Sequence, residues 1–595
     1  MAAFTSKATG NWSASGQTTW NEVGVPGDGD TVSIGAHTVT VDVNTTIGTS
    51  PNDTTTKVLD KTSATGSLII GAGVTLTVKG NIGGVNGSVY QLNTGASLVF
   101  DASGSGGTPV YKFVNVGSSK LIVNGTSGSR CGISAVSGYT ISLAGSFSQW
   151  DVTYCDFQRV AAGTVSINSA VNFTHNTTAN SGNVVFSLFT TTVSVDISDN
   201  TWSSTTGTAG AFQLTHSGVK TSGTRVMARN VFDKFITHNA IGFTIVDNAF
   251  CGGITCVAGR AWELFARNFV LQDGTLNSGN GAVFPASSYR NYFIVANETG
   301  NPHFVSATAT LGSDNTISQA IFEGRTPDLV DTGDCILVNA AATSGGTKII
   351  GKNNIVLKQS YSGNNAYTGT LLTLYANATS VTRWERNTIN VDDTSLGGVG
   401  KRGAFAFAEA GNGAAGQVEV LKSNIAWGSS ASQGYLAERI TGTVDGHITA
   451  SGADYNWLHN LSAGDNGRGY EDRGNTPGQD LWSTGNADGG DAAAAGVDNH
   501  QGTGNPQFLD SARNVAAWAV ARSYGSTYDD GLTAIKANPV RTADLIMYVF
   551  EGHKPTNAAC RNAAHDGSCV GAANFESGRS RVRLDAITAI FAGIF

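Results

Sequence analysis

Three acidic residues that directly follow a tryptophan are the first candidates for chemistry on a sugar. The pairs are Trp150-Asp151, Trp262-Glu263 and Trp384-Glu385. Hydrolysis of a glycosidic bond requires one carboxylic acid and one base or nucleophile at a defined separation. An aromatic ring offers a flat apolar face against which a sugar ring can pack. The candidate ligand-binding residues are therefore Trp150, Trp262 and Trp384.

Further carboxylates extend the set of candidate catalytic residues. Asp196 lies close to Asp199 in the sequence, so these two could form a pair. The main candidates are Asp151, Asp156, Glu263, Glu385, Glu409 and Glu438. The chain has 44 aspartate and glutamate residues, so chance alone places some of them beside tryptophan. The alternative interpretation is that these acids are solvated surface residues.

His553, Cys560, His565 and Cys569 form a cluster near the carboxyl end that could bind a metal. Two histidines and two cysteines suit tetrahedral zinc, but their spacing matches no common zinc-finger pattern. A disulfide between Cys560 and Cys569 and a pair of free thiols are the alternatives. We expect no bound metal and no cofactor.

The composition indicates which elements must position these residues. Glycine occupies 76 of the 595 positions, and charged residues make up only 13% of the chain. Gly, Ser, Thr, Asn and Val are prominent, which favours many short strands and turns. A mostly helical enzyme and a coiled coil therefore fit the composition poorly.

Charge and hydropathy exclude further classes of protein. The formal net charge is −8 and no long basic run is present, so a nucleic-acid groove is not expected. No stretch of 18 or more apolar residues occurs, so we expect no membrane span. The first residues, MAAFTSKATGNW, do not resemble a secretory signal. Seven cysteines are too few for a disulfide-stapled scaffold.

Two patterns along the chain predict its strands. Residues 31–42 alternate between apolar and polar positions after a Pro26–Asp30 turn, as half-buried strands do. Between about residues 198 and 457, asparagine followed by apolar or β-branched residues recurs at spacings from 18 residues (Asn230 to Asn248) to 39 (Asn315 to Asn354). The other repeat positions are Asn200, Asn268, Asn291, Asn387, Asn424 and Asn456.

This asparagine repeat predicts a coil of short strands in which the same turn recurs once per rung. Asparagine tolerates the left-handed conformation that such a turn requires, and stacked asparagines can hydrogen-bond along the axis. Longer spacings indicate loops inserted at one corner. A series of β-sandwiches with loose turn signals is the alternative.

The carboxyl end differs in class from the rest of the chain. Residues 515–521 and 529–550 carry helical patterns, the second interrupted by Pro539. A helix over the last rung would cover its open strand edges. We predict an N-terminal β cap over residues 1–45, a coil of strands over 46–504 and a C-terminal helical capping module over 505–595.

Three features together resemble right-handed parallel β-helix proteins such as phage tail spikes and other virion surface proteins. They are the Trp20 to Val32 opening, the asparagine repeat, and Asn505-Pro506-Gln507-Phe508 followed by the segment His565 to Ala572. The last segment departs from the usual form in the spacing between Asp566 and Gly571. The resemblance implies an all-β, right-handed parallel β-helix with a small helical module.

The resemblance also implies a function. We expect a tail spike, fibre or decoration subunit of a phage particle that binds host-surface polysaccharide, assembles as a homo-oligomer such as a trimer, and contacts other virion proteins. A surface-type protein without an export signal would leave the cell by lysis, so the expected location is the virion surface, extracellular after release. The alternatives are a polysaccharide depolymerase, either hydrolase or lyase, on the same scaffold, a decoration protein without a ligand, and a bacterial surface adhesin.

Overall fold

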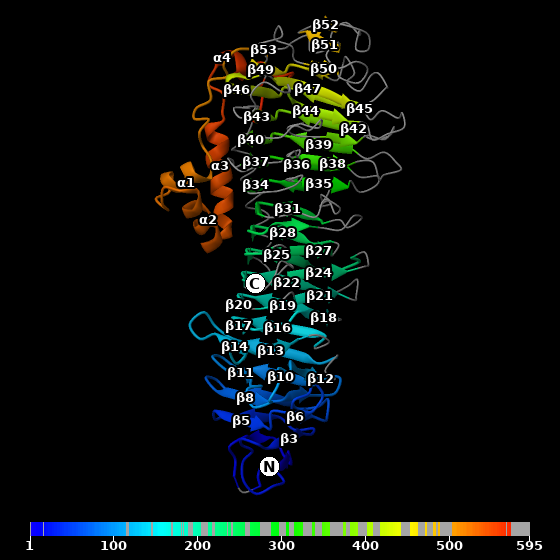
Figure 1. The fold of residues 1–595 in the computed structure, drawn as a ribbon, viewed down its shortest axis with the longest axis vertical. Coiled ribbons are helices and arrows are strands. Elements are labelled where there is room, and N and C mark those ends of the chain that lie inside the picture. Colours follow the sequence, from blue (N-terminus) through cyan, green and yellow to red (C-terminus); the bar gives the residue numbers. More distant parts are fainter. Residues whose placement is uncertain are drawn as a thin grey trace. The chain divides into compact units, whose positions relative to one another are not determined.

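A computed structural model shows a chain built mainly of short parallel β-strands, with helices near its carboxyl end (Figure 1). It forms two compact units, unit 1 (residues 1–271 and 538–540) and unit 2 (residues 272–537 and 541–595). The structure describes residues 2–572 apart from positions 16, 115–117, 144–146, 168–169, 180, 182–183, 189–193, 204–211, 217–219, 235, 240–241, 256–261, 274–286, 297–304, 309–313, 325–335, 340–347, 358–372, 376–380, 391–401, 409–416, 433, 442–452, 462–469, 473–479, 484–485, 488–501 and 567.

Unit 1 is a stack of coils whose strands pair in parallel with the strands of the next coil. The first sheet contains, in order, β2 (Gly10–Asn11), β4 (Val39–Val41), β7 (Ser67–Ile70), β10 (Val89–Leu92), β13 (Lys120–Asn124), β16 (Gln149–Thr153), β19 (Val171–Thr174), β22 (Val195–Ser198), β25 (Arg225–Ala228), β28 (Thr244–Val246) and β31 (Leu264–Ala266). The second sheet contains β5 (Thr45–Gly48), β8 (Thr75–Lys79), β11 (Ser97–Phe100), β14 (Cys131–Ala135), β17 (Cys155–Gln158), β20 (Thr177–Ala179), β23 (Thr201–Trp202), β26 (Val231–Phe232), β29 (Ala249–Phe250) and β32 (Phe269–Asp273).

Two further parallel sheets complete unit 1. One contains β1 (Ala3–Thr5), β3 (Thr31–Ile34), β6 (Lys57–Lys61), β9 (Asn81–Gly83), β12 (Tyr111–Val114) and β15 (Ile141–Ser142). The other contains β18 (Gly163–Ile167), β21 (Val184–Leu188), β24 (Phe212–His216), β27 (Ile236–Asn239) and β30 (Ile254–Thr255).

Unit 2 repeats this arrangement. Its first sheet contains β33 (Ser287–Tyr289), β36 (Asp314–Ser318), β39 (Lys348–Lys352), β42 (Val381–Glu385), β45 (Gln417–Lys422) and β48 (Ala453–Asp454). Its second contains β34 (Tyr292–Ala296), β37 (Ile321–Gly324), β40 (Ile355–Leu357), β43 (Thr388–Asn390), β46 (Ile425–Ser432), β49 (Trp457–Leu461) and β53 (Gly502–Thr503). Its third contains β35 (Val305–Thr308), β38 (Ile336–Asn339), β41 (Thr373–Tyr375), β44 (Arg402–Ala408), β47 (Gly434–Thr441), β50 (Tyr470–Asp472), β51 (Asp480–Ser483) and β52 (Asn486–Ala487), of which the last two pairings are antiparallel.

Inward-facing aromatic side chains stack from coil to coil inside unit 1. The rings of Phe173, Trp202, Phe232 and Phe250 follow one another at centroid distances of 5.4, 6.1 and 5.3 Å, with interplanar angles of 23° or less. This stacking arises because neighbouring strands pair in register, as in Trp202 opposite Phe232 and Phe232 opposite Phe250. The interior is therefore continuous along the stack of coils, as expected of a parallel β-helix.

An asparagine ladder runs beside the aromatic stack. In unit 1, the backbone N–H groups of Asn200, Asn230 and Asn248 donate to the Oδ1 atom of the ladder asparagine in the next coil, at 3.1, 2.9 and 3.0 Å. Their Nδ2 groups donate to the same acceptors at 2.9, 2.9 and 3.0 Å. This confirms that stacked asparagines bond along the axis.

The ladder also corrects two parts of the sequence interpretation. The left-handed residue is the one before the ladder position, for example Asp199 with φ 59° and Arg229 with φ 54°, and the ladder asparagine directly precedes the following strand, as Asn200 precedes β23. In the coil of β36, the ladder position is Ala320, whose N–H donates to Asn354 Oδ1 at 3.0 Å. Asn315 lies within β36 instead.

Unit 2 contains a corresponding asparagine ladder, made by Asn354, Asn387, Asn424 and Asn456. The Nδ2 groups of the first three donate to the Oδ1 atom of the next at 2.9, 2.9 and 3.0 Å. Each side chain also bonds the backbone of an earlier coil, as Asn424 Nδ2 does to Trp384 O at 3.0 Å. All four asparagines are buried, so every bond in the ladder is shielded from water.

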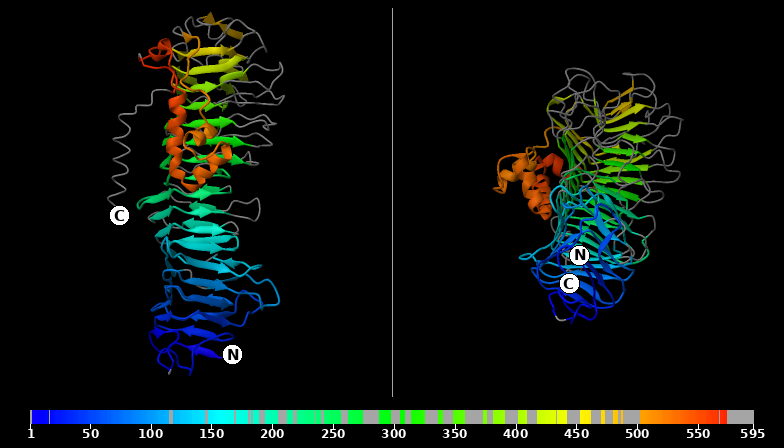
Figure 2. Two further views of the ribbon diagram at one scale, coloured as in Figure 1. Left: turned by 90° about the vertical axis from the view of Figure 1, so that its left-hand side faces the viewer. Right: turned by 60° about the horizontal axis from the view of Figure 1, so that its bottom comes forward.

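Helices occupy part of residues 505–572, as the sequence predicted. They are α1 (Val515–Ala521), α2 (Tyr528–Ala537), the short η1 (Pro539–Arg541), α3 (Thr542–Gly552) and α4 (Ala558–Arg561). Asn514 caps α1 by accepting from Ala517 N at 2.9 Å. Figure 2 shows α1, α2 and α3 from two further sides. The predicted boundaries after residues 45 and 504 stay predictions.

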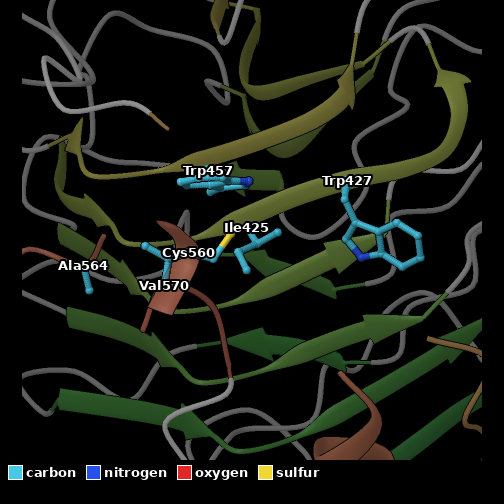
Figure 3. Close-up of a cluster of buried hydrophobic side chains, with 6 residues drawn as sticks. All are labelled: Ile425, Trp427, Trp457, Cys560, Ala564 and Val570. Atoms are coloured by element: carbon cyan, nitrogen blue, oxygen red, sulfur yellow. The ribbon is translucent and has the colours of Figure 1, made fainter. Parts of the chain in front are cut away.

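The segment that contains Cys560 and Ala572 docks on the coils of unit 2 through a small apolar core. Cys560, Ala564 and Val570 pack with Ile425, Trp427 and Trp457 (Figure 3). The Gly571 N–H donates to Ser423 O at 2.7 Å, and the Ala572 N–H donates to Thr388 Oγ1 at 2.9 Å. Apolar burial and backbone bonding together hold this segment against β43, β46 and β49.

A fully buried histidine lies in the core of unit 1. His238 in β27 accepts a hydrogen bond at Nδ1 from Trp262 Nε1 at 3.0 Å, and the Phe243 and Trp262 rings meet it edge-on at 4.8 and 5.5 Å. Burial lowers the pKa of His238 from 6.5 to about 3. The folded chain therefore keeps this imidazole neutral at pH values where an unfolded chain would protonate it.

We expect unit 1 to lose stability as the pH falls below about 6.5, because only the unfolded chain binds a proton at His238 until the pH nears 3. Between pH 8 and pH 5 the loss should be about 2 kcal/mol. Urea unfolding at both pH values should show a smaller loss for His238→Gln than for the wild-type chain. His37→Gln, at a partly exposed histidine, is the matched control. Equal losses in wild type and His238→Gln would contradict this linkage.

Candidate functional site

The outer face of the first sheet of unit 1 carries a straight row of side chains. Strand residues alternate between the interior and the outside, and in-register pairing aligns Gln91, Ile122, Asp151, Asn172 and Asp196 from coil to coil. We call these five residues the outer row. All five are half-buried, and their inward neighbours, such as Trp150 and Val152, are buried.

Hydrogen bonds fix the acidic part of the outer row. Asn172 Nδ2 donates to Asp151 Oδ1 at 3.0 Å. The Ser198 hydroxyl donates to Asp196 in a short hydrogen bond. Burial raises the pKa of Asp196 above its ordinary value, although the bond from Ser198 opposes this shift. The carboxyl groups of Asp151 and Asp196 therefore lie in different environments, one coil to either side of the Asn172 amide.

A column of turn residues borders the outer row. These residues occupy the left-handed turn positions between the first and second sheets, and we call Tyr154, His175, Asp199, Arg229, Asp247 and Arg267 the turn column. The rings of Tyr154 and His175 stack at 4.4 Å with an interplanar angle of 2°. His175 Nε2 lies 3.8 Å from Asp199, and Arg229 binds Asp199 through two nitrogens at 2.7 and 2.6 Å.

The same two-point pairing recurs two coils further along the turn column. Arg267 donates to both oxygens of Asp247 at 2.7 and 2.6 Å. Such bidentate pairs hold the planes of both groups fixed. The turn column thus contains two Arg–Asp pairs of fixed geometry and carries charge of both signs.

The structure corrects the assignment of the three tryptophans. Trp150, Trp262 and Trp384 are 1%, 3% and 1% exposed, so they belong to the core and present no face to a ligand. Trp150 Nε1 donates to Phe147 O at 3.2 Å, which fixes its ring inside the coil. Tyr154 and His175 of the turn column are half-buried aromatic residues beside the outer row.

Three of the candidate acids whose side chains the structure describes are each held by a separate basic residue. Asp156 binds Arg130 at 2.7 Å, Glu263 binds Lys220 at 2.6 Å and Glu385 binds Lys352 at 3.1 Å. These three acids are ion-pair partners of basic side chains. Glu409 lies outside the described residues, and Glu438 is placed only as a backbone position of β47.

Of the main candidate acids, only Asp151 lies in the outer row. Asp196, which the sequence analysis paired with Asp199, also lies in this row. Asp199 is held instead by Arg229. The sequence interpretation missed Gln91 and Asn172, which are separated from Asp151 by whole coils. The sequence pattern that could have identified them is the alternation of apolar and polar residues along each strand. Asn172, for example, lies between the inward-facing residues Val171 and Phe173.

The Cys/His cluster is not brought together as a metal site. His553 is buried with Nδ1 3.0 Å from Val549 O, and burial lowers its pKa to about 4. His565 Nδ1 instead lies 3.0 Å from Ser423 Oγ. Cys560 and Cys569 are free thiols in this structure, and burial raises the pKa of Cys560 to about 12. Within the described part of the chain, no three His, Cys, Asp or Glu side chains are grouped to hold a metal ion.

Comparison of the chain with protein-family models, curated proteins and solved structures finds no significant match in any of the three. None of the helices in the described ranges has the length and apolar character needed to cross a membrane.

Proposed function

We propose that this chain is a right-handed parallel β-helix protein of a phage particle, a tail spike, fibre or decoration subunit, that binds host-surface polysaccharide along the outer row. The observation that carries the proposal is the alignment of Gln91, Asp151, Asn172 and Asp196 on one outer face. Carboxylates and amides are the groups that bond sugar hydroxyls, since they combine strong acceptors with paired donors.

The spacing of the outer row favours an extended ligand. Neighbouring coils repeat about every 4.8 Å, so one bound sugar chain lying along the axis could bond several coils in succession. The backbone register positions these side chains, so little ordering is required when the ligand binds. The turn column adds Tyr154 and His175, whose stacked rings offer an apolar edge beside the row.

A polysaccharide depolymerase is the second candidate, and one observation favours it. Asp151 and Asp196 are two coils apart, about 9.6 Å between their backbones, and inverting glycosidases hold their two carboxyl groups roughly 6.5–9.5 Å apart. The raised pKa of Asp196 suits the general acid, which leaves Asp151 as the base. A decoration protein without a ligand is the outcome if neither binding nor cleavage occurs, and the genomic neighbourhood tests the alternative of a bacterial surface adhesin.

The location and assembly belong to the same proposal. A homotrimer on the virion surface, attached to other virion proteins and extracellular after release, is what the resemblance to tail spikes implies. Immunogold labelling of intact particles tests the location, and analytical ultracentrifugation of the full chain tests the assembly.

Binding should depend on the outer row. We expect Asp151→Ala combined with Asn172→Ala to weaken binding to a bacterial surface polysaccharide selected on a glycan array by about tenfold to a hundredfold, since hydrogen bonds involving a charged group contribute about 1.5–3 kcal/mol. Gln158→Ala, on the exposed outer side of β17, is the matched control and should bind like wild type.

A further variant, at Asp196, separates binding from cleavage. If the chain is a depolymerase, Asp196→Asn should abolish release of reducing ends while the variant still binds the polysaccharide. Wild-type chain that binds nothing on the array, or an outer-row double variant that binds as tightly as Gln158→Ala, would contradict the proposed function.

A further inference from the structure

Two cysteines occupy the same interior column as the asparagine ladder. The Cys155 N–H donates to Asn176 Oδ1 at 2.8 Å, in the way that the Asn176 N–H donates to Asn200 Oδ1 at 2.8 Å. Cys155 follows the left-handed residue Tyr154, as each ladder asparagine follows its own turn residue. Cys131 is the in-register partner of Cys155 on the adjoining strand. The column therefore changes from asparagine to cysteine at two successive coils.

This placement brings two thiols to neighbouring positions of one parallel sheet. In-register residues on adjacent strands have their backbones about 4.8 Å apart, which lies within the Cα separations that disulfides span, roughly 4.4–6.8 Å. Both side chains point inward, at 1% and 0% exposure. We propose that Cys131 and Cys155 are an oxidation site at which a disulfide links two successive coils of unit 1.

The described state is the reduced one. Both thiols are free, and Cys131 Sγ donates to Asn93 O at 3.1 Å. The sulfur of Cys131 must therefore rotate about its Cα–Cβ bond to leave Asn93 and face Cys155. The register already places the two residues opposite one another on adjacent strands.

The oxidant is a low-molecular-mass disulfide such as oxidised glutathione. The thiolate of one cysteine attacks this disulfide, forms a mixed disulfide and displaces one glutathione thiolate. The thiolate of the other cysteine then attacks the protein sulfur and displaces the second glutathione. The two protons of the protein thiols pass to the two glutathione thiolates, and two electrons pass to the small disulfide, which is thereby reduced to two thiols.

Burial determines when this reaction occurs. Desolvation raises the pKa of both thiols, and Cys155 is fully buried. The thiolate is the reactive form, so exchange is slow in the folded chain and fast while the coils are still forming. Cys560 and Cys569 are the competing pair, because they too are free thiols within one short segment.

The test uses the full chain, unfolded in urea and refolded with a mixture of oxidised and reduced glutathione. Remaining thiols are blocked with N-ethylmaleimide, and the chain is digested with trypsin without reduction. One tryptic peptide, residues 131–159, contains both cysteines, because no lysine or arginine lies between Arg130 and Arg159. We expect this peptide to lack two hydrogens and to carry no maleimide.

The controls keep the result decisive. Cys155→Ser should leave one maleimide on the same peptide, and Cys560→Ser should leave the linked peptide unchanged. The oxidised wild-type chain should also melt at a higher temperature than its reduced form, whereas Cys155→Ser should show no such shift. A peptide 131–159 with two maleimides after refolding, or with its cysteines joined to other peptides, would overturn the proposal.

Discussion

Replacement of the ladder residue Asn230 by leucine is expected to destabilise unit 1 strongly. Asn230 is fully buried, and its Oδ1 accepts from the backbone N–H and the Nδ2 of Asn200 at 3.1 and 2.9 Å. Its Nδ2 donates to Asn248 Oδ1 at 2.9 Å and to Ile197 O at 2.8 Å. Leucine has a similar shape but can form a hydrogen bond with none of these four partner groups.

Each buried polar group left without a partner costs about 1–3 kcal/mol. We therefore expect Asn230→Leu to lower the free energy of unfolding by about 4 kcal/mol or more, with the surrounding coils exchanging amide hydrogens faster. Urea unfolding and hydrogen exchange of peptides from β22, β25 and β28 measure both effects.

Asn124→Leu is the matched control for the ladder, because Asn124 is an exposed asparagine at the end of β13 in the same unit. It should change stability by less than about 0.5 kcal/mol. If Asn230→Leu and Asn124→Leu unfold at the same urea concentration, the ladder does not stabilise the stacked coils.

Replacement of Trp20 by alanine is expected to open the amino-terminal end of unit 1. Trp12 and Trp20 are both fully buried, with ring centroids 5.0 Å apart and an interplanar angle of 78°. Trp20 Nε1 donates to Trp12 O at 3.0 Å, and Trp12 Nε1 donates to Pro26 O at 3.1 Å. Phe4 packs edge-on against Trp20 at 6.2 Å.

Removing a buried tryptophan leaves a large cavity and costs about 3–5 kcal/mol. We expect Trp20→Ala to lower the melting temperature of the full chain and to expose residues 3–41 to rapid hydrogen exchange. Val23→Ala, at a side chain that is 84% exposed, is the control and should behave like wild type. Slow exchange of residues 3–41 in Trp20→Ala would show that the tryptophan pair does not close this end.

Much of the fold could be predicted because it depends on local patterns that the sequence carries. The strand after Pro26 alternates as expected, with Val32 and Ile34 buried and Thr31 and Ser33 half-buried in β3. The helix over residues 515–521 follows from its apolar spacing and its Asn514 cap. These features need no knowledge of which coil lies beside which.

Register could not be predicted from single segments. Asn315 fits the asparagine repeat in sequence, yet Ala320 takes the ladder position of that coil because Gln319 adopts the left-handed turn, with φ 53°. Asn176 was absent from the predicted repeat and is nevertheless part of the ladder. The pairing of strands between coils determines which residue occupies each ladder position. Because insertions of different lengths separate the strands, this pairing could not be predicted from the sequence.

The candidate site was predicted only in part for the same reason. In Gln149-Trp150-Asp151-Val152, tryptophan and valine share the inward side, which leaves Asp151 outside and removes Trp150 from any binding face. That alternation was visible in the sequence. The approach of Asn172 and Asp196 to Asp151 depends on coils of different lengths closing in register, so only the structure reveals it.

The most direct test of the stacked-coil fold is a crystallographic or cryo-EM density map of the full chain, in which the amides of Asn200, Asn230, Asn248 and Asn268 can be placed. We expect each Asn Oδ1 to lie about 3 Å from the backbone nitrogen of the ladder asparagine before it in the chain, with parallel strands on both sides. Density that places these asparagines in separate lobes, in antiparallel hairpins or at the solvent surface would contradict the fold and the outer row that depends on it.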